Sequence, residues 1–367
     1  MVTIFGELEA KTLLITGGGT GGHIFPAVAV AKEWLQRGEK GEREVVIVGT
    51  ERGLEAKLVP QAGLPLETIR VAGLKGIGGE KFFRNAALLP LGLWDSARIL
   101  DRRKFSAAFG VGGYASGPMM LMAKLNSIPT VIFEPNVEPG FTNRVLADMA
   151  TRVAVAHAET AELLGCKAVV TGCPVRAEFF TAPRKQPGSP LSLLITGGSR
   201  GARPINRAVV ASFDRWAARK KQLFIVHQTG ERDYNEVRLA YEQRDFNAEV
   251  LPFIENMAER FARADLILCR AGAITVAEVA AAGRAAIFIP FGAATDAHQM
   301  RNAEAMQAAG AARLLPQDEL SPDRLTAEIF SLLDQPRKIA DMSEQAHRLS
   351  RPRAVEDIVD LLEGVAL

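Results

Sequence analysis

The sequence predicts an α/β protein with two domains, each built around a parallel β-sheet. Runs of aliphatic residues with strand character alternate with amphipathic helical stretches along the whole chain. A glycine-rich turn follows such a run twice, at residues 17–23 (GGGTGGH) and 197–202 (GGSRGA), about half the chain apart. The chain of 367 residues is also long for a single hydrophobic core. Because uninterrupted βαβα order with apolar strands is typical of parallel sheets covered on both faces, we expect two Rossmann-like domains.

The amino-acid composition indicates an ordinary globular protein and argues against several other classes. Hydrophobic residues make up 48% and charged residues 23% of the chain, as in an ordinary globular protein. The formal net charge of +2 argues against nucleic-acid binding by bulk electrostatics. Three cysteines without a CxxC pair, and no recognisable signal peptide, indicate reduced thiols in a cytosolic protein. No apolar run reaches ~18 residues, so we expect no membrane span.

The first half of the chain predicts seven strands and several helices. The strands are expected near residues 12–16, 45–48, 67–71, 107–111, 130–133, 152–155 and 168–171. Between them, helices are expected at 26–36, 82–100, 115–124 and 140–149. Pro26 is expected in the first turn of its helix, where a missing N–H costs nothing.

The second half repeats this alternation. Its strands are expected near residues 191–196, 223–227, 248–251, 266–269 and 286–289. The turn-rich residues 172–174 and 183–188 are typical of an interdomain linker. We therefore expect one domain at 1–175 and a second at 176–342, with the last helical stretch, 343–362, returning to the first domain.

Five segments carry the candidate chemistry. A strand, a glycine turn and a helix together aim backbone N–H groups and a positive helix dipole end at an anion, so the two glycine turns predict a phosphorylated ligand. Three further segments also follow strands: 109–118 (FGVGGYASGP), 269–278 (CRAGAITVAE) and 290–299 (PFGAATDAHQ). Glu278 lies one turn into its helix, where a carboxylate can accept two ribose hydroxyls. All five segments are expected at the carboxyl ends of strands, where open α/β sheets bind ligands.

These motifs resemble those of the MurG family, the peptidoglycan GlcNAc transferases of the GT-B superfamily. The resemblance covers residues 12–345 in order. It implies the GT-B fold, with two Rossmann-like domains whose parallel sheets face each other across a cleft. It implies an inverting transfer of GlcNAc from UDP-GlcNAc to undecaprenyl-diphosphate-MurNAc-pentapeptide (lipid I), giving lipid II in peptidoglycan biosynthesis. The first domain would bind the acceptor and the membrane, and the second would bind UDP-GlcNAc.

The resemblance also implies roles for individual residues. His23 would be catalytic, and no metal or other cofactor is implied. The implied substrate-binding residues are Thr20, Gly21, Gly22, Asn136, Arg176, Ser199, Ile254, Ala273, Ile274, Thr275, Val276, Ala277, Glu278 and Gln299. The chain keeps the family's asparagine and arginine, as Asn136 and Arg176. It departs from the family pattern at four positions, Phe133, Pro135, Cys173 and Arg200.

The reaction needs a base for the acceptor hydroxyl and a sink for charge on the departing diphosphate. No Asp-x-Asp occurs in the chain, which argues against a metal-clamped diphosphate. Loop N–H donors and helix dipoles near Ser199 and at 273–275 would supply the sink instead. His23 suits the base, since an unperturbed imidazole has a pKa of about 6.5. A structural reading stays open for each residue: His23 as a helix cap, and Glu278 as an ordinary first-turn acid.

Residues 74–104 interleave apolar and aromatic residues with seven basic and three acidic ones. This pattern suits a surface that lies on an anionic membrane, although a core helix with a basic outer face has the same pattern. With a lipid-linked acceptor, we expect peripheral association with the cytoplasmic face of the cell membrane. Cell-wall and division proteins are further partners that the resemblance implies.

Three other functions remain open. A UDP-GlcNAc 2-epimerase has the same two-domain architecture but needs no acceptor. A dinucleotide-dependent dehydrogenase is disfavoured, because neither glycine turn is a clean GxGxxG followed by an acid about 20 residues on. A nucleotide-sugar sensor without catalysis would keep the same binding loops.

Overall fold

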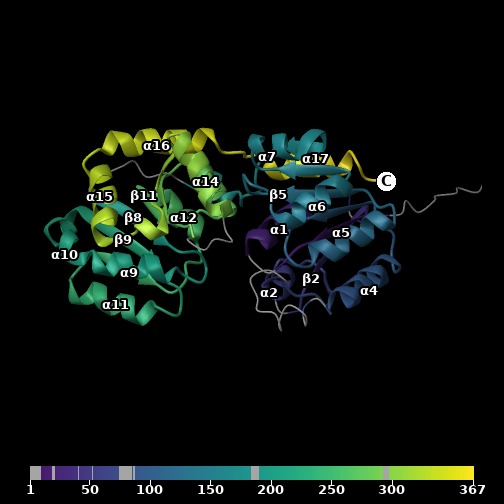
Figure 1. Ribbon diagram of the computed structural model, residues 1–367, viewed down its shortest axis with the longest axis horizontal. Coiled ribbons are helices and arrows are strands. Elements are labelled where there is room, and N and C mark those ends of the chain that lie inside the picture. Colours follow the sequence, from purple (N-terminus) through teal and green to yellow (C-terminus); the bar gives the residue numbers. More distant parts are fainter. Residues whose placement is uncertain are drawn as a thin grey trace, which may run out of the picture. The chain divides into compact units, whose positions relative to one another are not determined.

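The computed structural model describes residues 10–367 except 19, 20, 40, 52, 74–84, 86, 183–189 and 292–296. The chain forms two compact units (Figure 1). The first unit comprises the residues up to Val175 together with Arg353–Leu367, and the second comprises Arg176–Pro352. Each unit has its own parallel sheet with helices on both faces, the α/β architecture that the sequence predicts.

The first sheet has seven described strands, and all of its paired neighbours run parallel. They are β1 (Lys11–Thr16), β2 (Arg43–Gly49), β3 (Leu66–Thr68), β4 (Ala107–Gly110), β5 (Thr130–Glu134), β6 (Arg152–Val155) and β7 (Ala168–Val170). Their order in the sheet is β3-β2-β1-β4-β5-β6-β7. The winding direction therefore reverses between β1 and β4, and such a switch point is where open sheets bind ligands.

The helices of the first unit connect these strands and cover the sheet. They are α1 (Gly21–Gln36), α2 (Glu55–Gln61), α4 (Leu89–Leu100), α5 (Ser116–Leu125), α6 (Phe141–Met149), α7 (Ala158–Leu164) and α17 (Ala354–Glu363). The yellow α17 in Figure 1 comes from the end of the chain and packs against α1. Ion pairs tie it down: Arg37 contacts Asp360 at 2.5 Å and Glu363 at 3.0 Å, and Arg43 contacts Glu363 at 2.6 Å.

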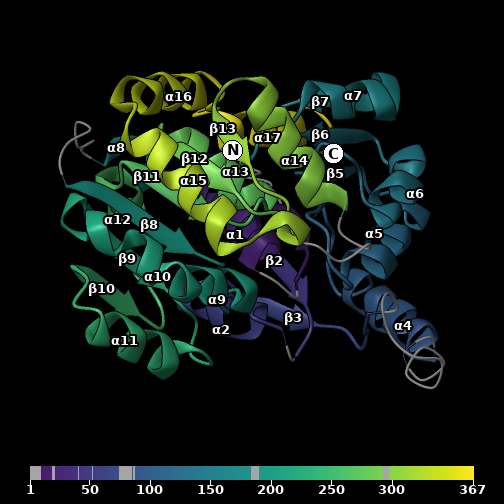
Figure 2. The same ribbon diagram turned by 60° about the vertical axis from the view of Figure 1, so that its left-hand side comes forward.

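The second sheet has six described strands, again with parallel neighbours. They are β8 (Leu191–Thr196), β9 (Leu223–Gln228), β10 (Ala248–Leu251), β11 (Leu266–Cys269), β12 (Ala285–Phe288) and β13 (Ala312–Leu314). Figure 2 shows β10, β9, β8 and β11 side by side, in agreement with the order β10-β9-β8-β11-β12-β13. Its switch point lies between β8 and β11.

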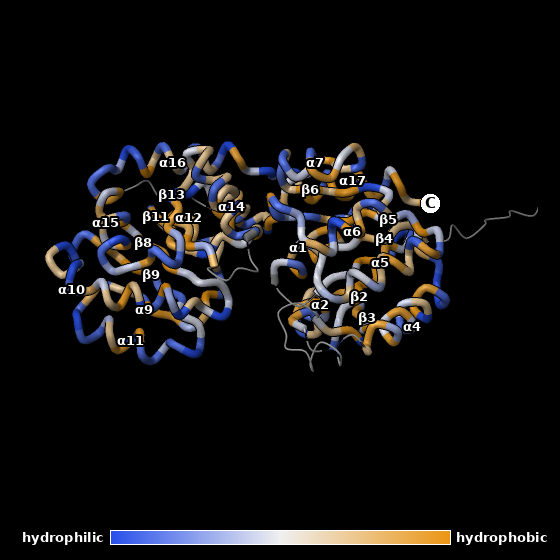
Figure 3. Tube along the Cα trace, viewed as in Figure 1, coloured by the Kyte–Doolittle hydropathy of each residue, from blue (hydrophilic) through white to orange (hydrophobic). Residues whose placement is uncertain are grey.

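The helices of the second unit lie on both faces of this sheet. They are α8 (Glu178–Thr181), α9 (Arg203–Ala211), α10 (Phe213–Trp216), α11 (Tyr234–Gln243), α12 (Met257–Arg263), α13 (Ala273–Ala282), α14 (Ala297–Ala308), α15 (Pro322–Leu333) and α16 (Pro336–Arg348). The central strands are orange in Figure 3, because their aliphatic residues are buried on both faces. Cys269 at the end of β11 is fully buried.

Several expected boundaries were wrong. Helix α1 begins at Gly21 and not at Pro26, so Pro26 lies inside the helix and His23 is its third residue. Proline lacks the N–H that would bond to the Gly22 carbonyl, yet the rest of the helix continues around this one missing bond. The stretch 343–362 is two helices, α16 and α17, because Pro352 disfavours helical geometry in the residue before it.

Other differences concern strand and helix lengths. Strand β13 was not predicted, because Ala312–Leu314 is too short to show a pattern, and β3 ends at Thr68. Helix α4 begins at Leu89, and the expected start at 82 lies outside the described residues, as does the proposed linker at 183–188. Within the part of the chain that the structure describes, no helix combines the length and apolar character required to span a bilayer.

Candidate functional site

The candidate residues gather at the carboxyl ends of strands beside the switch point of each sheet. In the first unit these ends lead into Gly17 and Gly18 after β1, residues 111–115 after β4 and 135–140 after β5. Since β1, β4 and β5 are neighbours, their loops lie side by side. In the second unit the corresponding loops follow β8, β9, β10 and β11.

The first glycine turn packs closely against the loop after β4. A Cβ atom on Gly17 would lie 2.2 Å from Cγ2 of Val111, and one on Gly113 would lie 2.3 Å from the carbonyl oxygen of Gly18. Gly113 also has a φ of +88°, a region that favours glycine. The two loops can therefore approach this closely only because Gly17 and Gly113 carry no side chain. Thr20 of the same turn lies outside the described residues, and Gly21 and Gly22 begin α1.

His23 lies in the first turn of α1, against the loop after β4. Its Nδ1 is 3.0 Å from the Gly18 carbonyl oxygen, which can only accept, so a neutral ring carries its proton on Nδ1 and presents a lone pair on Nε2. A Cβ on Gly112 would lie 3.1 Å from Nε2. Burial lowers the pKa of His23 below 6.5, although the Gly18 carbonyl and the carboxylates of Glu134 and Glu55 act to raise it. The ring is thus a neutral base near pH 7.

Glu134, which sequence reasoning did not select, organises the loop after β5. Its buried Oε1 accepts from the backbone N–H and the side-chain Nδ2 of Asn136, both at 2.9 Å. Its Oε2 accepts from the N–H of Gly140 and from Nδ2 of Asn143, again at 2.9 Å. The predicted ligand residue Asn136 is therefore held in place by Glu134. A carboxylate ending an apolar strand was the signal available in the sequence.

Glu55 is a second functional candidate that the sequence did not reveal. It is fully buried at the start of α2, and its Oε1 accepts from the backbone N–H and the hydroxyl of Thr50, at 2.9 and 2.7 Å. A Cβ on Gly18 would lie 2.2 Å from this oxygen. The Glu55 carboxylate thus lies directly against the glycine turn that contacts His23. Its segment looks like an exposed turn in the sequence, so only the structure places it here.

The second glycine turn is held by its own backbone. The N–H of Gly201 donates to the carbonyl of Gly198 at 2.8 Å, and the N–H of Gly198 donates to the Thr196 hydroxyl at 3.2 Å. A Cβ on Gly201, whose φ is +70°, would lie 1.8 Å from the Thr229 carbonyl oxygen. Ser199 is exposed at the tip of this turn. The loop therefore presents a hydroxyl and backbone groups to solvent on a rigid base.

The amino end of α13 offers backbone donors. Gly272 precedes the helix in an extended conformation, and no side chain of the described residues caps the first turn. The N–H groups of residues 273–275 are the orphan donors of that turn, which makes it suited to an anion. The N–H of Val276 donates to the Gly272 carbonyl, and the Val276 side chain is buried. This side chain is therefore not available for the ligand contact that was predicted for Val276. Ala277 is half-buried.

The structure brings Arg176 and Glu278 together. Nη2 of Arg176 lies 3.6 Å from Oε1 of Glu278, and its guanidinium also lies over the ring of Phe179. The Glu278 side chain is only 14% exposed, and burial raises its pKa to about 7, although Arg176 acts to lower it. Two residues predicted separately as ligand contacts therefore form one charged pair.

Two more predicted residues belong to segments that follow strands of the second unit. Ile254 is buried, and its N–H donates to Oε1 of Gln228 at 3.2 Å. Oε1 of Gln299, on α14, accepts from the N–H of Phe291 at 3.0 Å and thereby fixes that side chain beside the end of β12. The preceding residues 292–296 lie outside the described part of the chain.

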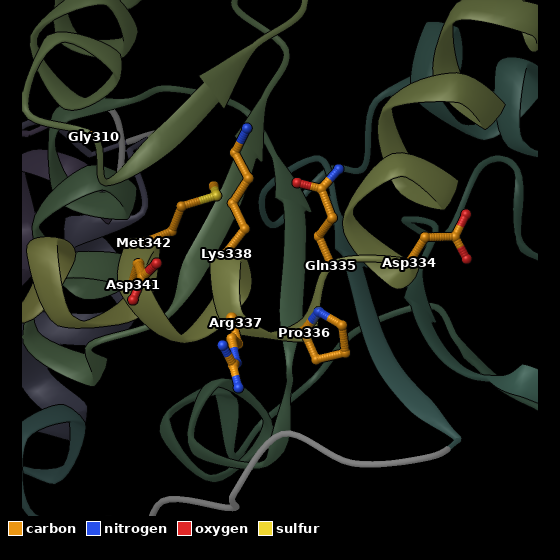
Figure 4. Close-up of a pocket in the computed structure, with 8 residues that line it drawn as sticks. All are labelled: Gly310, Asp334, Gln335, Pro336, Arg337, Lys338, Asp341 and Met342. Atoms are coloured by element: carbon orange, nitrogen blue, oxygen red, sulfur yellow. The ribbon is translucent and has the colours of Figure 1, made fainter.

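A pocket of about 750 Å³ lies elsewhere, at the start of α16 (Figure 4). Its lining mixes charges: Lys338 and Arg337 point in opposite directions, and Asp334 and Asp341 flank them. None of the predicted site residues lines it. Among the described residues there is also no cluster of histidine, cysteine and carboxylate side chains that could hold a metal ion.

Comparisons with known proteins show the family of this chain. Residues 13–155 match the glycosyltransferase family 28 N-terminal domain, and residues 192–358 match the corresponding C-terminal domain. Two curated relatives are named UDP-N-acetylglucosamine--N-acetylmuramyl-(pentapeptide) pyrophosphoryl-undecaprenol N-acetylglucosamine transferase. The protein from Pelobacter propionicus is 43% identical, over 95% of this chain and 98% of its own length. The protein from Geotalea uraniireducens is 45% identical, over 95% and 96%.

Solved structures give the same fold. MurG from Acinetobacter baumannii is 34% identical and superposes with a TM-score of 0.78, covering 96% of this chain and 99% of that one. A UDP-GlcNAc 2-epimerase from Neisseria meningitidis, bound to UDP-GlcNAc, has a TM-score of 0.68, covering 96% and 100%. Because that epimerase is only 14% identical, its likeness shows the fold alone.

Proposed function

This chain belongs to the MurG family of UDP-N-acetylglucosamine--N-acetylmuramyl-(pentapeptide) pyrophosphoryl-undecaprenol N-acetylglucosamine transferases, and on that premise we propose how its residues act. It transfers GlcNAc from UDP-GlcNAc to lipid I, which yields lipid II of peptidoglycan. The observation that carries this function is 43–45% identity to such enzymes over nearly the whole chain. The assignment of individual residues below is our proposal.

We propose that the second unit binds the donor at the switch point of its sheet. The uncapped amino end of α13 supplies N–H groups and a positive dipole end for the diphosphate. Ser199 adds a hydroxyl from the neighbouring glycine turn. Glu278, the sixth residue of α13, accepts hydrogen bonds from the ribose hydroxyls, and Arg176 adds a cation beside it. Charge that develops on the departing UDP is thus met by fixed donors.

In the first unit, we assign the general base to His23. Its Nδ1 is engaged by the Gly18 carbonyl, so the lone pair of Nε2 can take the proton of the acceptor hydroxyl. The lowered pKa keeps the imidazole neutral at pH 7. Asn136, oriented by Glu134, is assigned to the acceptor sugar from the adjacent loop.

We further propose that α4 contacts the membrane that carries lipid I. Trp94 is 57% exposed, and Leu89 and Leu91 of the same helix are also exposed. The guanidinium groups of Arg70 and Arg98 lie over the Trp94 ring, 5.7 and 5.6 Å from its centroid. Arg70 is also ion-paired with Asp95 at 2.7 Å, so Arg98 supplies the cation beside this exposed indole. An indole and a cation together suit the headgroup region of an anionic leaflet. The phenylalanines at 82 and 83, predicted for the same surface, lie outside the described residues.

The test of the proposed function is donor turnover with and without acceptor. We expect UDP release from UDP-GlcNAc only when a lipid I analogue is present, with a disaccharide product of β configuration. An epimerase would convert UDP-GlcNAc to its C2 epimer without any acceptor, and a sensor would bind it without turnover. Either of these outcomes would contradict the transferase assignment.

A further inference from the structure

Gln228 joins two loops of the proposed donor site. It is the last residue of β9, is 1% exposed, and has both ends of its amide engaged. Its Nε2 donates to the carbonyl oxygen of Gly198 at 2.8 Å, and its Oε1 accepts from the N–H of Ile254 at 3.2 Å. One buried side chain therefore bonds to the glycine turn after β8 and to the segment after β10.

The sheet order explains why this residue can reach both loops. Strand β9 lies between β8 and β10, and Gln228 pairs in register with Thr196 on one side and Leu251 on the other. The loops that follow these partners start at the same level of the sheet. A side chain at the end of the middle strand therefore lies next to the start of both loops.

Both bonds fix backbone at the edge of the proposed donor site, in addition to the contacts within the glycine turn. The Gly198 carbonyl accepts from Gly201 within the turn and from Gln228 outside it, and Gly198 itself has a φ of +87°. A glycine can adopt several backbone conformations at this position, and the bond from Gln228 favours the one that is observed. Ile254 is buried, and a buried N–H that loses its acceptor is costly.

We propose that Gln228 is a positioning residue for the donor: it sets the spacing between the Gly198 turn and the Ile254 segment, two parts of the second unit that we assign to binding the UDP moiety. The inference rests on the proposed function of these loops and adds a residue that does not itself touch the ligand. A correctly spaced pair of loops binds UDP without reorganisation, whereas an unlinked pair must be ordered on binding.

The first arm of the test removes both bonds. Gln228→Met keeps length and burial but neither donates nor accepts as an amide does. We expect the Kd for UDP, by calorimetry, to rise about 10-fold or more. The KM for UDP-GlcNAc should rise in parallel, while the KM for the lipid I analogue stays unchanged. Gln243→Met, at an exposed position at the end of α11, is the matched control and should change none of these values.

The second arm uses pH. In the Gln228→Glu protein the introduced carboxyl still accepts from Ile254, but it donates to Gly198 only when protonated. UDP affinity, divided by the wild-type value at the same pH, should therefore recover as the pH falls from 8 to 5. The neighbouring His227 bonds to Tyr241 and Asn206 on the other face, and burial lowers its pKa to about 3, so it does not titrate in this range. Glu278 does titrate, and the division by wild type removes its effect.

The outcomes separate this inference from its premise. Unchanged UDP affinity and donor KM in Gln228→Met would overturn the positioning role while leaving the donor site intact. A loss in Gln228→Glu that is the same at pH 8 and pH 5 would also overturn it, because a general packing defect does not depend on pH. Failure of the wild-type protein to bind UDP would instead remove the proposed donor site and this inference with it.

Discussion

Replacing Glu278 with glutamine should make the second unit more stable and its nucleotide binding weaker. The Glu278 carboxylate is largely buried, and burial raises its pKa from the ordinary 4.5 to about 7, against the opposing effect of Arg176. Its ionised form is therefore disfavoured in the folded protein. Glutamine is similar in shape to the protonated acid and carries no charge, so the substitution removes this penalty. It also leaves a single uncharged acceptor oxygen in place of the two carboxylate oxygens assigned to the ribose hydroxyls.

The magnitude follows from the pKa. The raised pKa means that the folded protein binds this proton more tightly than the unfolded chain does. The contribution of the Glu278 carboxyl to the free energy of unfolding is therefore fully present below pH 4.5 and is lost as the pH rises to about 7. A rise from 4.5 to about 7, at ~1.4 kcal/mol per pH unit, sets an upper limit of about 3.5 kcal/mol above pH 7. We expect Glu278→Gln to have little effect on the free energy of unfolding at pH 4 and to increase it by 1–3 kcal/mol, an order-of-magnitude figure, at pH 8.

The assay is urea unfolding monitored by the fluorescence of Trp216, which is buried in the second unit. Trp34 and Trp94, both in the first unit, are replaced by phenylalanine in every protein that is compared. Glu236→Gln, at an exposed position on α11, is the control and should be neutral at both pH values. A stability difference that is equal at pH 4 and pH 8 would refute the reasoning from burial.

The same variant tests the ribose assignment. Loss of a charge-assisted hydrogen bond should weaken UDP-GlcNAc binding by about 1.5–3 kcal/mol at pH 8. Wild-type affinity should itself fall as the pH drops below 7, because Glu278 must then lose its proton to accept both hydroxyls. Glu278→Ala should show the same loss of affinity, and donor binding at wild-type strength in either variant would show that Glu278 contacts no part of the donor.

Three further predictions concern the first unit. His23→Ala should lower kcat by roughly 10²–10⁴-fold with little change in donor affinity. The acidic limb of the pH–rate profile, expected below pH 6.5, should vanish with it. A variant that keeps this limb would exclude His23 as the base. Glu55→Gln removes a carboxylate that raises the pKa of His23, so the acidic limb should move to lower pH; an unmoved limb would show that Glu55 acts only on packing. Trp94→Ser should reduce sedimentation with anionic vesicles and leave UDP affinity intact, whereas Leu349→Ser, an exposed position in the second unit, should not. Equal vesicle binding by the Trp94 variant would place the membrane contact elsewhere.

The sequence by itself determined the α/β class, the strands of both sheets except β13, and the glycine turns. These features are local: a buried parallel strand is a continuous apolar run, and a turn such as 197–202 needs glycine where a Cβ would strike the next loop. The same local pattern located His23 and Glu278, because a residue just after a strand and a turn lies at the ligand-binding edge of an open sheet.

Only the tertiary structure decided which of these edges are neighbours and which other side chains reach them. Glu55, Glu134 and Gln228 are far from His23 or from the glycine turns in the sequence. They lie at the candidate site because the strand order places their elements beside its loops. The pKa of Glu278 likewise depends on burial and on Arg176, about a hundred residues away. Contacts and desolvation of this kind arise from long-range packing, which leaves no local pattern in the chain.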